Sequence, residues 1–341
     1  MKNRLWIKRI VGLIVAMFVV LCIFVYWTRH SIPGRSYNGP LPPLGSAQQL
    51  IQTELRKHLT QLSKKIGARH VGAMQNMRRA EHYIHNTFQR LGYKVRKVGF
   101  PMNKRAAKGK QKWVYNIEAT QPGHTHNKEL LVIGAHYDTV PGCPGANDNT
   151  SGIAGVLVLA KQLRQHTSNI TLRFVGFANE EPPYFRSSKM GSLYYARTVE
   201  GKKEKIKGMI SLETIGYFSD KPGSQRYPFP LGLFYPSKGN FIGFVSNFSS
   251  RSFLHQNIRL FRQHAKIPSE GAATFSELPG VGWSDHWSFW QAGYPAIMVT
   301  DTAPYRYPHY HKQTDTVDKL KLRHMTWVID GLMSMIRKWT K

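Results

Sequence analysis

The chain has 341 residues, of which 41% are hydrophobic and 20% are charged, so it can form a sizeable core and is not a disordered protein. Lysine and arginine number 48 against 19 aspartates and glutamates, which gives a formal charge of +29. Because the basic residues are scattered along the chain, we interpret them as a solvated surface suited to an anionic membrane face or an acidic compartment. We expect no nucleic-acid partner.

The N-terminus carries an uncharged apolar run, residues 10–27, which is long enough to cross a bilayer as a helix. Four basic residues precede it: Lys2, Arg4, Lys8 and Arg9. This charge predicts that segment 1–9 stays in the cytoplasm and that the chain after residue 28 is periplasmic or extracellular. Since no small-x-small cleavage site follows the run, we expect an uncleaved transmembrane anchor and a single-pass membrane protein, not a removed signal peptide.

Residues 28–45 are rich in proline and glycine and are predicted to be a linker, followed by one domain over 46–341. Apolar residues at helical spacing predict helices at 55–66, 77–91, 153–163, 190–198, 253–264 and 317–339. Short apolar runs predict strands at 93–100, 113–119, 131–135, 170–178, 209–213 and 296–300. This alternation predicts a single three-layer α/β domain with a largely parallel central sheet. We interpret 217–247, rich in glycine, proline, serine and aromatics, as an insertion near the functional site.

Acidic and histidine side chains follow four of the predicted strands, at the edge where an open α/β sheet binds ligands. In chain order they are His136, Asp138, Asp148, Glu180, Glu181, Glu213, His309 and His311. Each of them alone could lie in a solvated loop. Together, imidazoles and carboxylates at four strand ends are the ligand types of two zinc ions or similar divalent cations. The sequence therefore predicts a metal site at this edge.

These residues and their surroundings resemble the M28 family of zinc aminopeptidases, in a membrane-anchored bacterial form, over about residues 48–320. The matching segments are HYDTVP at 136–141, GANDNTSG at 145–152, NEE at 179–181, LETIGY at 212–217, SDHWSFWQAGYPA at 284–296 and HKQTDT at 311–316. The resemblance implies a zinc-exopeptidase-like fold, two Zn²⁺ ions that Co²⁺ or Mn²⁺ could replace, and hydrolysis of peptides with a free N-terminus.

The resemblance also implies roles for the ligands. His136, Asp148 and Glu213 would hold one zinc, and Asp148, Glu181 and His311 would hold the other, with Asp148 bridging them. In the motif, His311 has the offset from Asp315 and Thr316 that the family's ligand has, whereas His309 does not. We therefore expect His309 to be a neighbour of the site.

The chemistry of the residues gives part of the roles of Asp138, Glu180 and Glu181. Asp138, two residues after His136, can orient the imidazole ring. Glu180 and Glu181 should diverge, so that one binds metal and the other reaches the zinc-activated water. The residue types leave open which does which, and the resemblance makes Glu180 the general base.

Some family members have a tyrosine three residues before the serine of the SDH segment, which stabilises the oxyanion. This chain has Val281 there, which leaves Tyr217, Trp283 and Tyr310 as candidates for the oxyanion donor.

Cys143 lies among turn residues and is interpreted as a thiol without a role in the site. Since the other cysteine, Cys22, lies in the anchor, no disulfide is expected in the exported domain.

Two alternative functions remain. Glutaminyl cyclases resemble this fold and catalyse intramolecular acyl transfer with one zinc, whereas the retained His136 and Asp138 pair favours a two-metal hydrolase. A non-catalytic, receptor-like ectodomain would be expected to lack some of the ligands, and here the whole ligand set is present. No oligomeric state is predicted.

Overall fold

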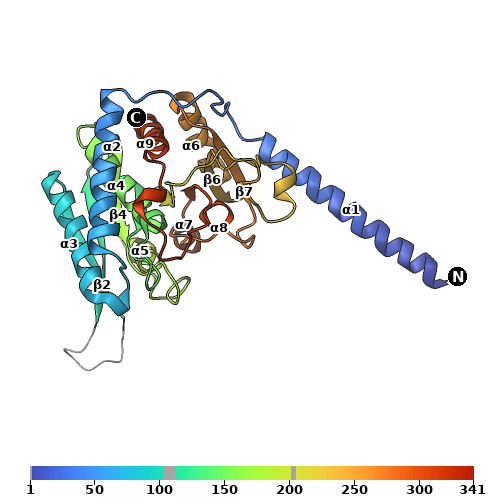
Figure 1. Cartoon of the computed structure of the whole chain (residues 1–341), viewed down its shortest axis with the longest axis horizontal. Helices are drawn as coiled ribbons and strands as arrows, with labels where there is room; N and C mark the ends of the chain where they lie inside the picture. Colours follow the sequence, from blue (N-terminus) through green and yellow to red (C-terminus); the bar gives the residue numbers. More distant parts are fainter. Residues whose placement is uncertain (1, 103–111, 201–204) are drawn as a thin grey trace.

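The computed structural model describes residues 2–102, 112–200 and 205–341, and within them one sheet forms the centre of the fold (Figure 1). Its eight strands lie in the order β1-β2-β4-β3-β5-β8-β6-β7. Their bounds are β1 Lys94–Pro101, β2 Trp113–Gln121, β3 His126–His136, β4 Ile170–Phe177, β5 Lys205–Glu213, β6 Ile242–Asn247, β7 Ser269–Thr274 and β8 Ala296–Thr300. The pairs β3/β4, β3/β5, β5/β8 and β6/β7 are parallel, and the others are antiparallel. The predicted α/β domain with a largely parallel sheet is confirmed.

Helices cover both faces of the sheet. The described α-helices are α1 Lys2–His30, α2 Ser46–Leu59, α3 Met74–Arg90, α4 Gly152–Leu163, α5 Gly191–Glu200, α6 Arg251–His264, α7 His286–Gln291, α8 Ala303–Arg306 and α9 Leu322–Trp339. Helices α2, α3, α4, α6 and α9 enclose the larger hydrophobic core on one face. Helices α5 and α7 pack on the other face against a smaller apolar cluster. The fold therefore has three layers.

The helices differ in how much of their surface is apolar, according to where they pack. In α9, buried Met325, Ile329, Leu332 and Ile336 recur every three or four residues, so one stripe faces the core. Helix α4 is buried on nearly all sides because it lies between the sheet and the helices α2 and α9. This explains why it begins with the wholly apolar sequence GIAGVLVLA.

Two strands were not predicted, and both extend the sheet beyond β8. Strand β6 lies inside the stretch 217–247, so the interpretation of that whole stretch as an insertion is wrong at its C-terminal end. Strand β7 has the sequence SEGAAT, whose small residues give almost no β signal. The last helix begins at Leu322 instead of residue 317, because Val317–Lys319 form a separate 3₁₀ turn.

The N-terminal helix α1 projects away from the domain, and its C-terminal part lies near β7 (Figure 1). Among the described residues, its segment Trp6–His30 is the one helix long and apolar enough to cross a membrane. Residues 31–45 form no helix or strand and connect α1 to α2. The boundaries of anchor, linker and domain stay predictions.

Candidate metal centre

Two groups of side chains meet at one edge of the sheet. In the first, His136 Nε2 lies 3.4 Å from Asp148 Oδ1 and 3.2 Å from Glu213 Oε2. In the second, His311 Nε2 lies 3.0 Å from Asp148 Oδ2 and 3.2 Å from Glu181 Oε2. Within each group, the donor atoms lie within 4.8 Å of one another, close enough to bind a common cation. Asp148 belongs to both groups.

The fold explains why these residues meet. His136 ends β3, Glu213 ends β5 and Glu181 follows β4, and these three neighbouring strands are parallel. Their carboxyl ends therefore lie at the same edge. Asp148 arrives from a turn that contains Gly145 at φ +59°, where an added Cβ would collide with the Asp148 carbonyl. Glycine is therefore required at that position.

The donor set fits zinc. His136 Nε2, Asp148 Oδ2 and Glu181 Oε1 are buried and make no well-aligned hydrogen bond among the described residues. Such atoms are normally satisfied, and buried carboxylates this close together repel one another. A divalent cation bound here would give these atoms a partner and would offset the repulsion between the carboxylates. Imidazole nitrogen and carboxylate oxygen are both zinc ligands.

The electrostatics of the cluster link metal binding to pH. Burial and the neighbouring Asp148 carboxylate raise the pKa of Glu181 to about 8. Burial alone would lower the pKa of His136, but the carboxylates of Glu213 and Glu180 hold it well above its ordinary value. Protons and a divalent cation therefore compete for the same atoms, so metal affinity should fall as the pH falls.

Glu180 lies beside the first group and belongs to neither. Its Oε2 is 3.7 Å from His136 Nε2, whereas the neighbouring Glu181 faces His311. The Asp138 carboxylate accepts hydrogen bonds from the backbone N–H groups of Glu180 and Glu181, each at 3.1 Å. It also lies 3.5 Å from His136 Nδ1. One carboxylate thus fixes the backbone of both glutamates and faces the imidazole. The roles of ligand, orienting residue and base stay predictions.

Two further aspartates hold the loop that presents Asp148. Asp315 accepts hydrogen bonds from the backbone N–H groups of Asn147 (2.8 Å) and Asp148 (3.0 Å) and from the Tyr307 hydroxyl (2.7 Å). Asp301 accepts one from Asn147 Nδ2 at 2.9 Å. Asp301 was not predicted as a site residue, although its position directly after β8 places it at the same sheet edge. Asp315 was predicted only as part of the segment that contains His311.

A buried arginine, Arg69, ties this loop to the end of β3. Its guanidinium donates to the carbonyl oxygens of Tyr137 (2.7 Å) and Pro144 (3.0 Å) and to the Thr150 hydroxyl (2.8 Å). Burial lowers the pKa of Arg69 to about 10, so its guanidinium stays charged at neutral pH. A single arginine outside any motif gives no sequence signal, and Arg69 was not predicted.

Three residues at the centre have a backbone conformation that is rare outside glycine. Asn179 (φ 59°) precedes Glu180, Thr214 (φ 47°) follows Glu213, and His311 itself has φ 57°. Each such residue costs about 1–3 kcal/mol, and such residues are concentrated at functional sites. The surrounding hydrogen bonds must offset this cost.

The remaining candidates lie near the centre. His309 forms a hydrogen bond with the Thr314 hydroxyl at 2.8 Å and belongs to neither donor group. The Cys143 thiol donates to the Lys312 carbonyl, and burial raises the pKa of Cys143 to about 12, so it is a neutral thiol. The Tyr310 ring stacks on His311 with centroids 3.9 Å apart.

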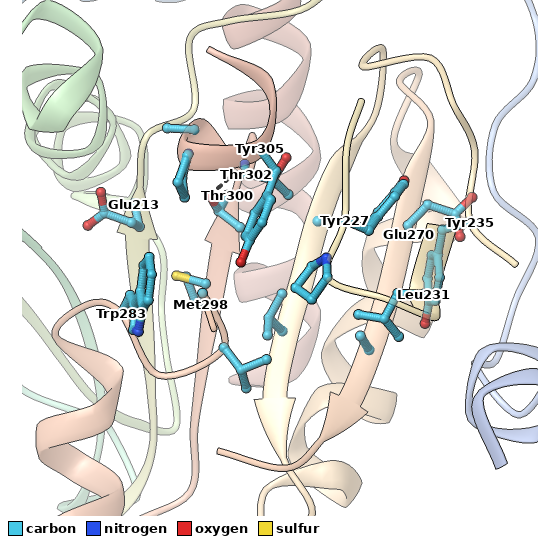
Figure 2. Close-up of a pocket in the computed structure, with 18 of the residues that line it drawn as sticks. Glu213, Tyr227, Leu231, Tyr235, Glu270, Trp283, Met298, Thr300, Thr302 and Tyr305 are labelled. Carbon is cyan, nitrogen blue, oxygen red and sulfur yellow. Dashed lines mark hydrogen bonds between the residues drawn. The ribbon is translucent and has the colours of Figure 1, made fainter. Parts of the chain in front are cut away.

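A pocket begins at this centre and continues across β8, β6 and β7 (Figure 2). Glu213 and Tyr310 line it near the donor groups, and Glu270 lines its far part. The space between its walls is about 880 Å³, and this volume includes open solvent at the mouth. Most of its other lining residues are apolar or aromatic.

Residues 116–335, more than half of the chain, match the family model of Peptidase family M28. The chain belongs to peptidase family M28. It is 33% identical over 336 residues to YfbL of Escherichia coli (strain K12), an uncharacterized protein, and the match covers 94% of this chain and 98% of that protein. It is 28% identical over 228 residues to leucine aminopeptidase 1 of Arthroderma otae. That match covers 62% of this chain and 54% of the relative, so the chain spans about half of its length.

Solved structures share the fold at low sequence identity. The zinc aminopeptidase BSAP of Bacillus subtilis matches with a TM-score of 0.68 and 15% identity, over 89% of this chain and 97% of that chain. The glutaminyl cyclase of Fimbriiglobus ruber matches with a TM-score of 0.61 and 21% identity, over 89% and 98%. The predicted membership of the M28 zinc metallopeptidases, and with it the prediction of a hydrolytic enzyme, is confirmed.

Proposed function

We propose that this M28 member is an aminopeptidase that hydrolyses the N-terminal bond of peptides with a free N-terminus. The observation that supports it most is the pair of donor groups joined at Asp148. In this proposal His136, Asp148 and Glu213 hold one zinc ion, and Asp148, Glu181 and His311 hold the other. The three carboxylates offset most of the charge of two divalent ions.

Two bound zinc ions would polarise the scissile carbonyl and make a water molecule more acidic. Glu180 takes the proton of the attacking water and returns it to the leaving amine. Its position next to His136, outside both donor groups, supports this role. Asp138 holds the backbone of Glu180 and thereby fixes where that carboxylate points.

Tyr310 is the oxyanion donor in this proposal. Tyr310 and Trp283 both line the pocket, but Tyr310 stacks on His311, whereas Trp283 is 43% exposed and the Tyr217 ring packs on Tyr307. Tyr310→Phe should lower kcat about 10²- to 10³-fold with a small change in KM, as loss of one oxyanion donor does. An unchanged kcat would exclude this role.

We also propose that α1 anchors the enzyme as a single-pass protein, with residues 1–9 in the cytoplasm and the peptidase domain outside it. The apolar segment Trp6–His30 and the basic residues at its start support this topology.

The second candidate function is glutaminyl cyclisation, which the likeness to glutaminyl cyclases supports. One screen separates the two. Zinc-loaded full-length protein is given a peptide with a free N-terminus, its N-acetylated form and a peptide beginning with glutamine. The proposal predicts hydrolysis of the free peptide and none of the acetylated one. A pyroglutamyl product without release of any N-terminal residue would favour the cyclase.

A further inference from the structure

The floor of the pocket contains one row of cross-strand neighbours. Glu213 of β5 pairs with Thr300 of β8, Thr300 with Gly243 of β6, and Gly243 with Glu270 of β7. Strands lie about 4.8 Å apart, so Glu270 is roughly 14 Å from Glu213. Both glutamates line the same pocket (Figure 2). The pocket therefore extends from a proposed zinc ligand to the edge strand of the sheet.

A second row explains why this floor is hollow. Met298, Val245 and Ala272 are paired neighbours on β8, β6 and β7, and all three line the pocket. Side chains alternate between the two faces of a strand, so Gly243 and Ala272 are the pocket-facing residues of β6 and β7 at these positions. Because glycine and alanine stand where larger residues would fill the space, the pocket continues past β8.

The opposite wall is apolar. The cover loop, residues 226–235, contributes Tyr227, Pro228, Leu231 and Tyr235 to the lining. Figure 2 shows Tyr227, Leu231 and Tyr235 grouped at the end that contains Glu270, away from Glu213. A ligand that reached this end would exchange water for apolar and aromatic surface.

Glu270 does not make this end a cation site. Its Oε2 lies 3.6 Å from Arg29 Nε of α1, and Arg262 also offsets its charge. Burial raises the pKa of Glu270 above its ordinary value in spite of these two arginines. The carboxylate is thus already paired, and the free surface beside it is apolar.

The same end of the pocket lies against the apolar N-terminal helix. Phe229 of the cover loop stacks on Phe18 of α1 with ring centroids 5.7 Å apart, and it is otherwise 73% exposed. The guanidinium of Arg29 lies over the Tyr235 ring at 5.4 Å. If α1 spans a bilayer, as proposed above, the cover loop lies beside the lipid.

We propose that the pocket binds a hydrocarbon group longer than any of the twenty amino-acid side chains, carried by the first residue of the substrate. This inference rests on the proposed aminopeptidase function and narrows its substrate class to peptides with a free α-amino group whose first side chain is, or carries, a linear alkyl chain. At about 1.25 Å per methylene, which follows from bond lengths of roughly 1.5 Å, an extended chain of roughly eleven carbons spans the distance between the ends of the floor row. A lysine side chain covers less than half of that distance.

The test uses zinc-loaded full-length protein in nanodiscs and the p-nitroanilides of alanine, leucine, L-2-aminooctanoic acid and L-2-aminododecanoic acid. Each buried methylene should raise kcat/KM about fourfold until the pocket is full. Calorimetric binding of the four free amino acids, corrected with empty nanodiscs, should show the same order without depending on turnover. A lysine anilide tests the alternative that Glu270 selects a cation.

The variant Ala272→Phe fills the far end of the floor, and Ala272→Leu serves if the larger side chain prevents folding. Either should reduce the ratio of kcat/KM for the aminododecanoyl substrate to that for the alanyl substrate by at least tenfold. The control Ala47→Phe, at an exposed position of α2, should leave this ratio unchanged.

Two results would overturn the inference. One is a plateau of both kcat/KM and binding at leucine, and the other is a preference for the lysine anilide that Glu270→Gln abolishes. Hydrolysis of leucine anilide together with such a plateau would leave the proposed function intact. If no anilide were hydrolysed, the aminopeptidase proposal would fail, and the binding series would still decide what the pocket accepts.

Discussion

The backbone N–H of Asp148 donates to Asp315 Oδ2 at 3.0 Å, so two acidic residues far apart in the sequence lie in direct contact. The bond joins the loop before α4 to the loop before α9. Since Asp148 belongs to both donor groups, the C-terminal loop that carries His311 also fixes the residue common to them. The two halves of the proposed metal centre are thus held together by one carboxylate.

Asp315→Asn should weaken metal binding, because an amide has one acceptor oxygen where the carboxylate has two, and one backbone N–H would lose its partner. We expect a loss of about 10- to 100-fold in zinc affinity, measured by competition with a chelator. Asp318→Asn is the matched control, since Asp318 is exposed in the same segment. Equal zinc affinity in both variants would show that Asp315 does not position the loop.

Asp148→Asn should weaken both metal sites, whereas Glu213→Ala and His311→Ala should each weaken mainly one. The reason is that Asp148 is the one residue common to the two groups. Elemental analysis after dialysis against dilute zinc measures the stoichiometry. One zinc per chain in fully active wild-type protein would contradict the two-metal proposal.

The topology prediction follows from the basic residues before the apolar helix. A reporter that is active only outside the cytoplasm, fused after Lys341, should be active, and a reporter restricted to the cytoplasm should be silent. Deletion of residues 1–30 should reverse the pattern. A reversed pattern in the intact chain would exclude the proposed orientation.

A buried histidine gives a stability prediction. Burial lowers the pKa of His58 to about 4, although Glu54 at 3.7 Å from Nε2 opposes the shift. Tyr83 bonds the other ring nitrogen, and Lys57, Lys161 and Arg90 also disfavour protonation. The unfolded chain therefore takes up this proton first, and the His58 contribution to stability is lost as the pH falls from about 6.5 to 4.

The measurement is urea unfolding of wild type and His58→Asn at pH 7 and pH 4.5. The stability advantage of the wild type should shrink at the lower pH, by up to roughly 3 kcal/mol. His82→Asn, at an exposed position of α3, is the control and should show no such change. An advantage that grows on acidification would mean that His58 is charged in the folded protein.

The sequence predicted those parts of the molecule that have a periodic or motif signal. Strands β3, β4 and β5 are rich in apolar residues. Strand β3 ends at His136 and β5 at Glu213, so both the sheet and the gathering of these two residues at its edge followed from the pattern. The order of strands did not follow, because pairing depends on contacts between distant segments. Strand β7, made of small residues, had no pattern to detect.

The residues that hold the centre were harder to predict than its candidate ligands. Arg69 and Asp301 act through hydrogen bonds to backbone and amide groups, which any segment can offer. Arg69 has no sequence signal, and the position of Asp301 after a predicted strand does not distinguish its role from that of a solvated loop residue. The pocket depends on the absence of large side chains at Gly243 and Ala272, and their alignment on one face of the sheet can be recognised only when the register of β6 and β7 is known.

The central claim is that Glu180 is the general base and Glu181 a metal ligand. The most direct test measures kcat, KM and zinc content for two variants, Glu180→Gln and Glu181→Gln. Glu180→Gln should retain zinc and a nearly unchanged KM while kcat falls by about 10²- to 10⁴-fold, because the amide keeps the shape but cannot accept the proton. Glu181→Gln should lose zinc together with activity. Loss of zinc from Glu180→Gln and its retention in Glu181→Gln would show that Glu180 is the ligand and Glu181 the base. Full activity in both variants would contradict the mechanism.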